Sequence, residues 1–183
     1  MLLLLPMNDN LDNYRQLLAR VDALCLEIGS ILQGQITCSE GCSSCCTSIT
    51  IFPVEAAALQ AALAALPTEA AATIRRHVEE HADGERCPLL SRHRCLLYDA
   101  RPVICRTHGL PIIFAADNGK QVDCCPLNLS ESESLPGTAI IDLDRLNSVL
   151  VAVNALYLTQ CDAPDDTPER LTIAEAILGF PRK

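Results

Sequence analysis

Apolar residues recur at helical spacing over residues 8–33, near the beginning of the chain. Leu17 and Ile28 fall on one face of a helical projection, while charged residues such as Glu27 fall mostly on the other. Apolar positions three and four residues apart are typical of an amphipathic helix that packs one face on a core. The pattern therefore predicts a helix over this segment, ended by Gly34.

Similar patterns predict four more helices and a few short β segments. The expected helices lie at 54–66, after Pro53 in a first-turn position; at 69–82, capped by Thr68; after Asp142 or Asp144, as a long helix; and from Thr167–Arg170 to Gly179. The expected β segments are 49–52, 95–98, 112–115 and 120–123, and the expected loops are 37–48, 84–94 and 130–137. Asp117-Asn118-Gly119 joins the last two β segments in a hairpin, because Asn-Gly accepts a positive φ.

These elements indicate a mainly α fold with short β hairpins, in which about five helices surround a cysteine-rich metal-binding core. The chain has 183 residues, of which 49% are apolar, and this suits a single domain over 1–183 with a real core. Within it we expect a cysteine-cluster metal-binding region at 37–126 and a helical C-terminal part at 140–180. Residues 1–7 are interpreted as a frayed or mis-called start, with Met7 as an alternative first residue.

Charge and targeting signals narrow the classes of function. A net charge of −9 disfavours non-specific nucleic-acid binding, which needs Lys and Arg to neutralise phosphates. No apolar run reaches the 18 residues of a membrane span, and the opening Leu2–Leu5 run lacks the basic flank and cleavage site of an export signal. We therefore expect a cytoplasmic protein without membrane or nucleic-acid partners, whose thiols are kept reduced.

The cysteines carry the chemistry of this sequence. There are eleven, and nine of them fall between Thr37 and Pro126. Thiolates spaced as C-x3-C-x2-C-C on a Gly- and Ser-containing loop can turn toward one metal ion, so in a reducing compartment metal binding is favoured over disulfides. Cys25 lies on the apolar face of the first helix and Cys161 ends the long one, so both are interpreted as uninvolved. The candidate metal ligands are Cys38, Cys42, Cys45, Cys46, Cys87, Cys95, Cys105, Cys124 and Cys125.

The order of these motifs resembles the YkgJ-type cysteine-cluster family, whose CxxCxxCC proteins are described as zinc- or iron-chelating and often as containing iron–sulfur clusters. The resemblance rests on Cys42-x2-Cys45-Cys46, Cys87-Pro-Leu-Leu, Cys95-Leu-Leu-Tyr-Asp-Ala-Arg-Pro-x-x-Cys-Arg and the later pair Cys124-Cys125. It covers residues 38–126. The family's C-x2-C opening stands here as C-x3-C, from Cys38 to Cys42. The resemblance implies a metal or Fe–S centre and no particular reaction.

Four other residues are candidates for supporting roles. Arg101 and Arg106 flank Cys105, where they could donate hydrogen bonds to sulfur or form an ion pair with Asp99 or Asp123. Pro102 is placed to start a short helix there. His108 could be a ligand or a structural residue, and Tyr98 a core ring or a donor near the site.

Together these features predict a metal-binding protein with a cysteine-ligated centre and a redox or electron-transfer role. We favour iron, as an Fe–S cluster, over Zn²⁺, because single cysteines spread along the segment differ from compact zinc-finger pairs. One alternative is a metal-dependent or redox enzyme with an open coordination site. Others are a structural-zinc protein and a metal-delivery or sensing protein with a protein partner for redox or metal transfer. No P-loop, dinucleotide-binding or His-Glu-x-x-His motif occurs in the sequence.

Overall fold

The structure, a computed structural model, describes residues 2–3, 10–38, 41–129 and 134–181. The expected start at 1–7, the first two residues of the first expected helix and part of the 130–137 loop lie outside these residues, apart from Leu2 and Leu3. The described part contains six α-helices: α1 (Asp12–Ile31), α2 (Pro53–Ala64), α3 (Thr68–Glu80), α4 (Val103–Thr107), α5 (Leu143–Gln160) and α6 (Ile173–Leu178). The mainly helical prediction is confirmed, and the short helix expected at Pro102 is α4, which begins directly after that residue.

The strands are short and pair in small sheets. They are β1 (Leu2–Leu3), β2 (Thr50–Ile51), β3 (Leu90–Ser91), β4 (Arg94–Cys95), β5 (Ile112–Ala116), β6 (Gly119–Asp123), β7 (Ile141–Asp142), β8 (Leu171–Thr172) and β9 (Phe180–Pro181). β1 pairs with β9, β2 with β8 and β3 with β4, all antiparallel, while β5 lies between antiparallel β6 and parallel β7. The predicted hairpin at 112–123 is confirmed, and Gly119 adopts the positive φ that its turn requires.

Four local predictions were wrong. Thr68 is the first residue of α3 and not its cap, which is Pro67 without a side-chain hydrogen bond. The loop expected at 84–94 contains β3, and the strand expected at 95–98 stops at Cys95 before a 3₁₀ turn. The last helix begins after Thr172, whose hydroxyl and Glu175 form a reciprocal capping box, because residues 171–172 are held in β8 by pairing with β2.

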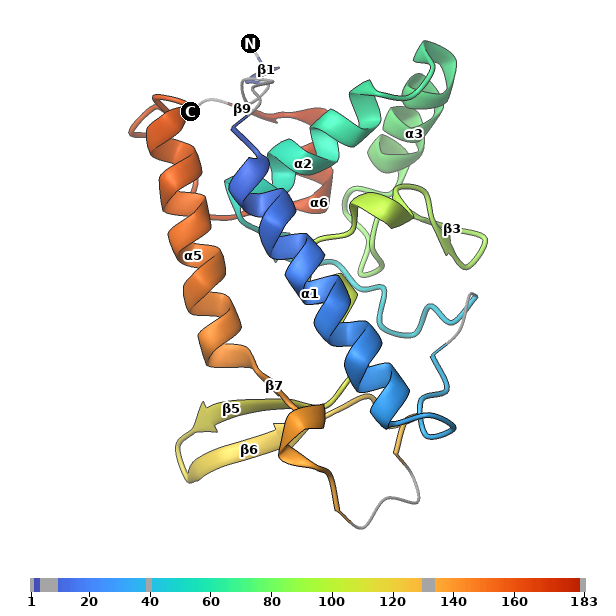
Figure 1. Cartoon of the computed structure of the whole chain (residues 1–183). Coiled ribbons are helices and arrows are strands. Elements are labelled where there is room, and N and C mark those ends of the chain that lie inside the picture. The colour runs from blue at the N-terminus through green and yellow to red at the C-terminus, as the bar shows by residue number, and fades with distance from the viewer. Residues whose placement is uncertain (1, 4–9, 39–40, 130–133, 182–183) are drawn as a thin grey trace.

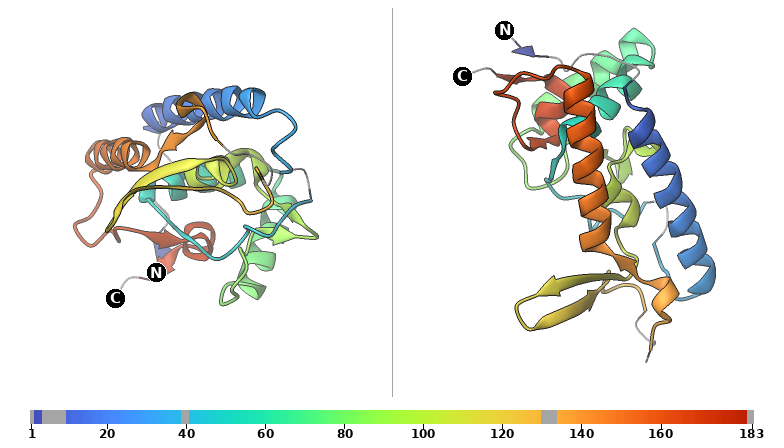
Figure 2. Two further views of the ribbon diagram at one scale, coloured as in Figure 1. Left: turned by 90° about the horizontal axis from the view of Figure 1, so that it is seen from below. Right: turned by 60° about the vertical axis from the view of Figure 1, so that its left-hand side comes forward.

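The helices are arranged around an apolar core (Figures 1 and 2). α1 and α5 run side by side along the molecule, α2, α3 and α6 gather at one end, and the β5–β6 hairpin lies at the other. The main buried cluster joins side chains from α1, α2, α3, α5 and α6 with Leu89, Leu97 and Val103 from the segment that carries the cysteines. A smaller cluster connects the end of α1 to β7 through Ile28, Leu32, Ala139 and Ile141.

Buried polar side chains connect the helices across this core. Glu55 of α2 is 3% exposed and accepts hydrogen bonds from the backbone N–H of Phe52 and of Val103, both at 3.0 Å. Asn154 of α5 accepts from Val54 N at 3.1 Å, and Gln60 of α2 donates to Ala176 O at 3.0 Å. Each partner is a main-chain group at a helix end or near one, where such groups lack partners inside the helix. Glu55 thereby fixes the start of α4, which carries Cys105.

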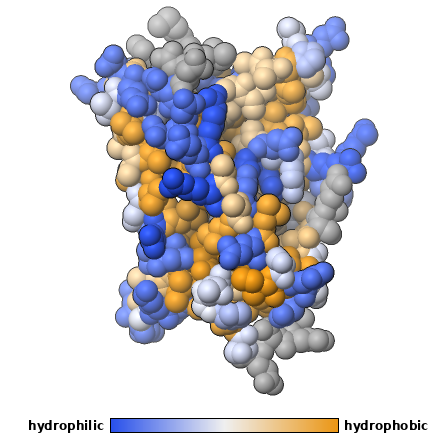
Figure 3. Space-filling view, viewed as in Figure 1, coloured by the Kyte–Doolittle hydropathy of each residue, from blue (hydrophilic) through white to orange (hydrophobic). Residues whose placement is uncertain are grey.

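The outer faces of α1 and α5 mix apolar and charged side chains (Figure 3). Leu24, Leu26, Val149 and Leu156 are among the exposed large apolar residues. No helix in the described part of the chain is both long and apolar enough to cross a membrane.

Candidate metal centre

Four parts of the chain bring six of the nine candidate ligands into one neighbourhood, which we call the six-thiol group. Its members lie on the loop before β2, on the segment between α3 and β3, on β4 and on α4: Cys42, Cys45, Cys46, Cys87, Cys95 and Cys105. Electrostatic interactions join Cys46 to Cys42 and Cys87, and Cys105 to Cys46, Cys87 and Cys95. Cysteines up to sixty residues apart in the sequence therefore act on one another through space.

Backbone hydrogen bonds hold the first two segments together. Cys87 N donates to Cys46 O at 3.1 Å, and Ser48 N donates to Glu85 O at 2.8 Å. Thr47 and Arg86 form the antiparallel bridge between these bonds. The Cys45-Cys46 pair is thus held against Cys87 by a short two-stranded contact, although the chain between them forms α2 and α3.

Burial favours the protonated form of five of these six thiols. Loss of hydration is the main cause that raises the pKa of Cys45, Cys46, Cys87 and Cys95, because a thiolate is poorly stabilised away from water. The effect is largest at Cys105, whose pKa rises to about 12, and the neighbouring thiols add to it. The thiols of Cys45, Cys46, Cys87, Cys95 and Cys105 therefore favour the neutral form, and a metal ion must displace their protons in order to bind.

The thiols neighbour one another without converging on a point. Among the described residues, no three His, Cys, Asp or Glu side chains are placed so that they could hold a metal ion as they stand. Zinc bound by thiolates needs Zn–S distances of about 2.3 Å, so the side chains would have to turn or the loops close. The donor chemistry of the group fits zinc or an iron–sulfur cluster, while its metal-free geometry is open.

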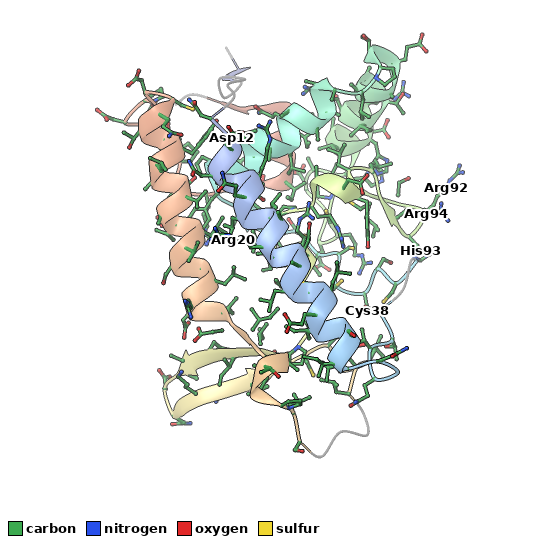
Figure 4. All side chains as sticks on the ribbon, viewed as in Figure 1. Asp12, Arg20, Cys38, Arg92, His93 and Arg94 are labelled. Carbon is green, nitrogen blue, oxygen red and sulfur yellow. The ribbon has the colours of Figure 1, made fainter. Side chains whose placement is uncertain are left out.

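A strained hairpin turn lies beside the thiol loop. Arg92 and His93 connect β3 to β4 with φ of 47° and 64°, in the left-handed region that non-glycine residues rarely adopt. The ring Nδ1 of His93 lies 3.0 Å from Ser43 Oγ, and Ser43 is only 7% exposed. Figure 4 shows the side chains of Arg92, His93 and Arg94 at the outer margin of the molecule. The turn therefore connects β3–β4, which carries Cys95, to the loop of Cys42 and Cys45.

Arg86 fixes the same loop from the other side. Its guanidinium donates to the backbone carbonyl oxygens of Ser43 and Ser44. Its positive charge also opposes the rise in pKa of Cys46 and Cys87, since a nearby cation favours a thiolate. Arg86 is thus the residue best placed to offset negative charge on those two sulfurs.

Arg106, one of the two arginines expected to support Cys105, holds the backbone instead. Arg106 forms an ion pair with Asp22 of α1, with Nη1 2.7 Å from Oδ2, and also donates to the carbonyl oxygens of Arg101 and Asp99. An ion pair was one of the two expected roles, but its carboxylate is that of Asp22 and not of Asp99 or Asp123. Arg106 therefore attaches α4 to α1.

Tyr98, Arg101 and His108 lie nearer the surface. The Arg101 guanidinium lies 3.6 Å from the centre of the Tyr98 ring, which is 55% exposed. Tyr98 is therefore a surface residue rather than a core ring. His108 is exposed and ends α4 in extended backbone.

The other three candidates, Cys38, Cys124 and Cys125, lie around a different set of contacts. A Cβ added to Gly109 would stand 2.8 Å from Cys38 Sγ and 3.7 Å from Cys125 Cβ, so both cysteines pack on the same glycine. Asn128 Nδ2 lies 3.4 Å from Cys38 Sγ and 2.6 Å from Gly109 O. Cys124, beside Cys125, has its pKa raised first by burial and then by Asp123.

The two cysteines set aside from the ligand candidates lie along the helices. Cys25 of α1 is half-buried, and its Sγ lies 3.6 Å from Arg106 O. Cys161 follows α5 and accepts a hydrogen bond from Asn10 Nδ2 at 3.6 Å. Both make local contacts that need no metal.

Several residues around the cysteines had not been singled out from the sequence. Arg86 stands next to Cys87 and could have been noticed as a neighbouring charge, and Gly109 follows the expected helix at Pro102, where a positive φ is common. Ser43, Glu55 and Asn128 carry no such signal. Their roles depend on contacts with segments far away in the chain.

Comparison with known proteins supports the family expected from the motifs. Residues 37–126 match the family model "CxxCxxCC: Putative zinc- or iron-chelating domain". The match contains all nine candidate ligands and ends just before Asn128. No curated protein and no solved structure matches the chain. The segment 37–126 thus matches the CxxCxxCC family, whose model is described as a putative zinc- or iron-chelating domain.

Proposed function

We propose that the chain binds an iron centre, of the iron–sulfur type, through thiolates of the six-thiol group, with Zn²⁺ as the competing occupant. The observation that carries the proposal is the backbone contact that places these cysteines together: Cys87 N donates to Cys46 O at 3.1 Å, and Leu90, which pairs with Cys95, donates from its N–H to Cys87 O at 2.9 Å. Cys105 lies close enough for Cys46, Cys87 and Cys95 to raise its pKa. Four sulfurs are the number that one zinc ion or one cluster takes from a protein. Cys42 and Cys45 supply further donors at the exposed side of the group.

Iron–sulfur chemistry gives the centre a redox role in which it accepts and donates one electron. The chain's own contribution is to hold the sulfurs on separate segments and to set the charge around them. Arg86 and Arg101 favour the thiolate forms of neighbouring cysteines, and they would also favour a more negative, reduced centre. The burial of Cys105 restricts water on the inner side of the group.

Exposure of the thiol loop favours metal delivery as a second function. Cys42 and Cys45 are exposed, whereas Cys87, Cys95 and Cys105 are half-buried. A metal ion handed from one protein to another passes through thiolates that both partners can reach. The graded exposure would let an ion enter at the loop and leave by the same side.

Anaerobic purification followed by metal analysis, sulfide analysis and visible absorption tests the proposal. We expect bound iron with acid-labile sulfide and a broad charge-transfer absorption. Cys46→Ser and Cys105→Ser should each lower the bound metal, whereas Cys161→Ser, outside the group, should retain the wild-type amount. Stoichiometric zinc without sulfide would overturn the iron–sulfur part, and a protein that binds neither metal would overturn the proposal as a whole.

A strong chelator separates the redox and delivery functions. An enclosed redox centre should keep its metal during hours of exposure to the chelator, while a delivery site should release it within minutes. Rapid loss from the wild type, slowed when Cys42→Ser removes the exposed thiol, would favour delivery. Retention in both proteins would exclude it.

A further inference from the structure

Asn128 is a buried amide that lies outside the segment matched by the family model. Its side chain is 3% exposed, and it stands two residues beyond the end of that match. A buried amide is retained without penalty only when its donors and acceptors are satisfied. The partners of Asn128 therefore indicate what it is for.

Each end of this amide contacts a different part of the chain. Asn128 Oδ1 accepts from Thr37 N at 2.9 Å and from Thr37 Oγ1 at 3.0 Å. Asn128 Nδ2 donates to Gly109 O at 2.6 Å, with Cys38 Sγ at 3.4 Å from the same nitrogen. The backbone N–H of Asn128 donates to Cys125 O at 2.9 Å. One side chain thus connects the segments that carry Cys38 and Cys125.

Gly109 explains why these contacts can form. Its φ of +92° and its missing Cβ leave room for Cys38 Sγ, which a Cβ there would approach to 2.8 Å. Any larger residue would push the sulfur away from Asn128 and strain the backbone. Cys38 is exposed at its outer side, yet its sulfur has a fixed inner contact with a hydrogen-bond donor.

We propose that Asn128 is a positioning residue for a metal thiolate at Cys38, which it holds next to Cys125 by donating an N–H to the sulfur. The inference rests on the proposed metal binding and extends it to a residue that the family model does not contain. An N–H donor aimed at a ligand sulfur orients it and stabilises its negative charge. Cys38 and Cys125 then form a thiolate pair with Asn128 as their common anchor.

A double-mutant cycle with Co²⁺ as the probe tests this role. Asn128→Asp keeps an oxygen for Thr37 but replaces the donating nitrogen with a second, negatively charged oxygen. We expect it to weaken Co²⁺ binding by about 10–100-fold, as loss of an outer contact to a ligand does. Cys38→Ser should also weaken binding, and the double variant should bind as Cys38→Ser does, because the amide acts only through that sulfur.

Asn154→Asp is the matched control. Asn154 is also a buried asparagine whose Oδ1 accepts a backbone N–H, but it lies on α5 and serves α2. We expect Asn154→Asp to lower the melting temperature of the metal-free protein while leaving Co²⁺ affinity unchanged. Equal losses of affinity in Asn154→Asp and Asn128→Asp would overturn the inference, because they would show a general effect of destabilisation.

Hydrogen exchange separates the anchoring contact from the metal. In the metal-free wild type the Thr37 amide should be protected, although Thr37 is exposed, because it donates to Asn128. Protection should be lost in Asn128→Ala and retained in Asn128→Asp. A wild-type affinity in Asn128→Asp, or additive losses with Cys38→Ser, would overturn the positioning role while leaving the proposed function intact. A wild type that binds no metal would instead overturn both.

Discussion

The helical core and the six-thiol group differ in how deeply their side chains are buried and in how many of their polar groups have partners within the chain. In the core, Leu59 and Ile177 are fully buried, and Glu55, Gln60 and Asn154 each have hydrogen-bond partners. In the six-thiol group the sulfurs are exposed or half-buried, and no three donors among the described residues are placed to hold one metal ion. One region is held by packing and hydrogen bonds within the chain, while the other offers sulfur donors that a metal ion could bind.

This difference argues that the scaffold folds first and the metal completes a local part of it. Small zinc domains that lack a core unfold when the metal is removed, because metal binding supplies most of their folding free energy. Here the buried apolar cluster spans α1, α2, α3, α5 and α6, and Cys87 and Cys95 of the six-thiol group pack against it as partly buried side chains. We therefore expect chelation to loosen the loops around the cysteines and to leave the helices in place. The following changes test that contrast.

The largest effect is expected inside the core. Leu59→Ala removes a fully buried side chain of α2 and should lower the free energy of unfolding of the metal-free protein by about 2–5 kcal/mol. Urea denaturation followed by circular dichroism measures the loss. The control is Leu26→Ala on α1, which is 76% exposed and should change stability by less than about 0.5 kcal/mol. If metal restored the stability of Leu59→Ala, the two regions would not be independent.

Glu55 lies where the core meets the cysteine-bearing segment, and its replacement is expected to have the next largest effect. Its two oxygens each accept a backbone N–H, from Phe52 and from Val103. Glu55→Gln supplies only one oxygen and turns an NH₂ group toward the other donor, so we expect a loss of about 1–3 kcal/mol. Thermal unfolding measures the loss, with exposed Glu80→Gln as the control. A stabilised Glu55→Gln would mean that the cost of burying the charge outweighs its hydrogen bonds.

Raising the pH should destabilise the metal-free protein through the buried thiols. The pKa of Cys105 rises from 9.0 to about 12 on folding, so near pH 10 the unfolded chain releases a proton that the folded chain keeps. The folded state binds more protons there, and its stability therefore falls as the pH rises from 8 to 10, by on the order of 1 kcal/mol for this group. Urea denaturation at both pH values measures the fall. Cys105→Ser should reduce it, and an unchanged fall in that variant would assign the effect to other groups.

The smallest effect is expected at the turn between β3 and β4. Arg92 adopts a left-handed φ of 47°, a conformation that costs a non-glycine residue roughly 1–2 kcal/mol. Arg92→Gly should relieve part of this strain and raise stability by about 0.5–1 kcal/mol, net of the greater freedom of glycine in the unfolded chain. Thermal unfolding should show a small upward shift, while exposed Arg20→Ala on α1 shows none. A lower melting temperature would mean that the Arg92 side chain stabilises the turn by contacts of its own.

The regular helices could be predicted because their apolar spacing is local information. The stripe around Leu17 and Ile28 matches α1, and the proline at the start of α2 marks its first turn. The start of α6 was placed too early, at a plausible cap-like sequence near Thr167. The deciding interaction was the pairing of Leu171–Thr172 with β2, which the local sequence does not contain.

The sequence predicted which cysteines belong to the candidate site, but not how these cysteines are arranged in space. The motifs indicated which thiols to examine, and the family match over 37–126 agrees with that choice. The C-x3-C spacing sets Cys38 apart from Cys42 but does not say what either sulfur contacts: Cys38 packs on Gly109 and Asn128, while Cys42 neighbours Cys45 and Cys46. The difference arises from backbone and side-chain contacts between segments about 90 residues apart in the chain. Such contacts follow from the whole fold and leave no local signature.

The pairing of β2 with β8 joins an early part of the chain to a late one, so the core cannot close until the late part has been synthesised. Gln60 of α2 donates to Ala176 of α6, 116 residues later, so the core closes only when the C-terminal part has left the ribosome. All nine candidate ligands are made before that point. At about 5–20 residues per second, the nascent chain carries its reactive sulfurs for several seconds without the scaffold that spaces them. Oxidants and metal ions therefore first encounter these thiols on an unfinished chain, and a reducing environment during translation decides how many of them reach the folded protein intact.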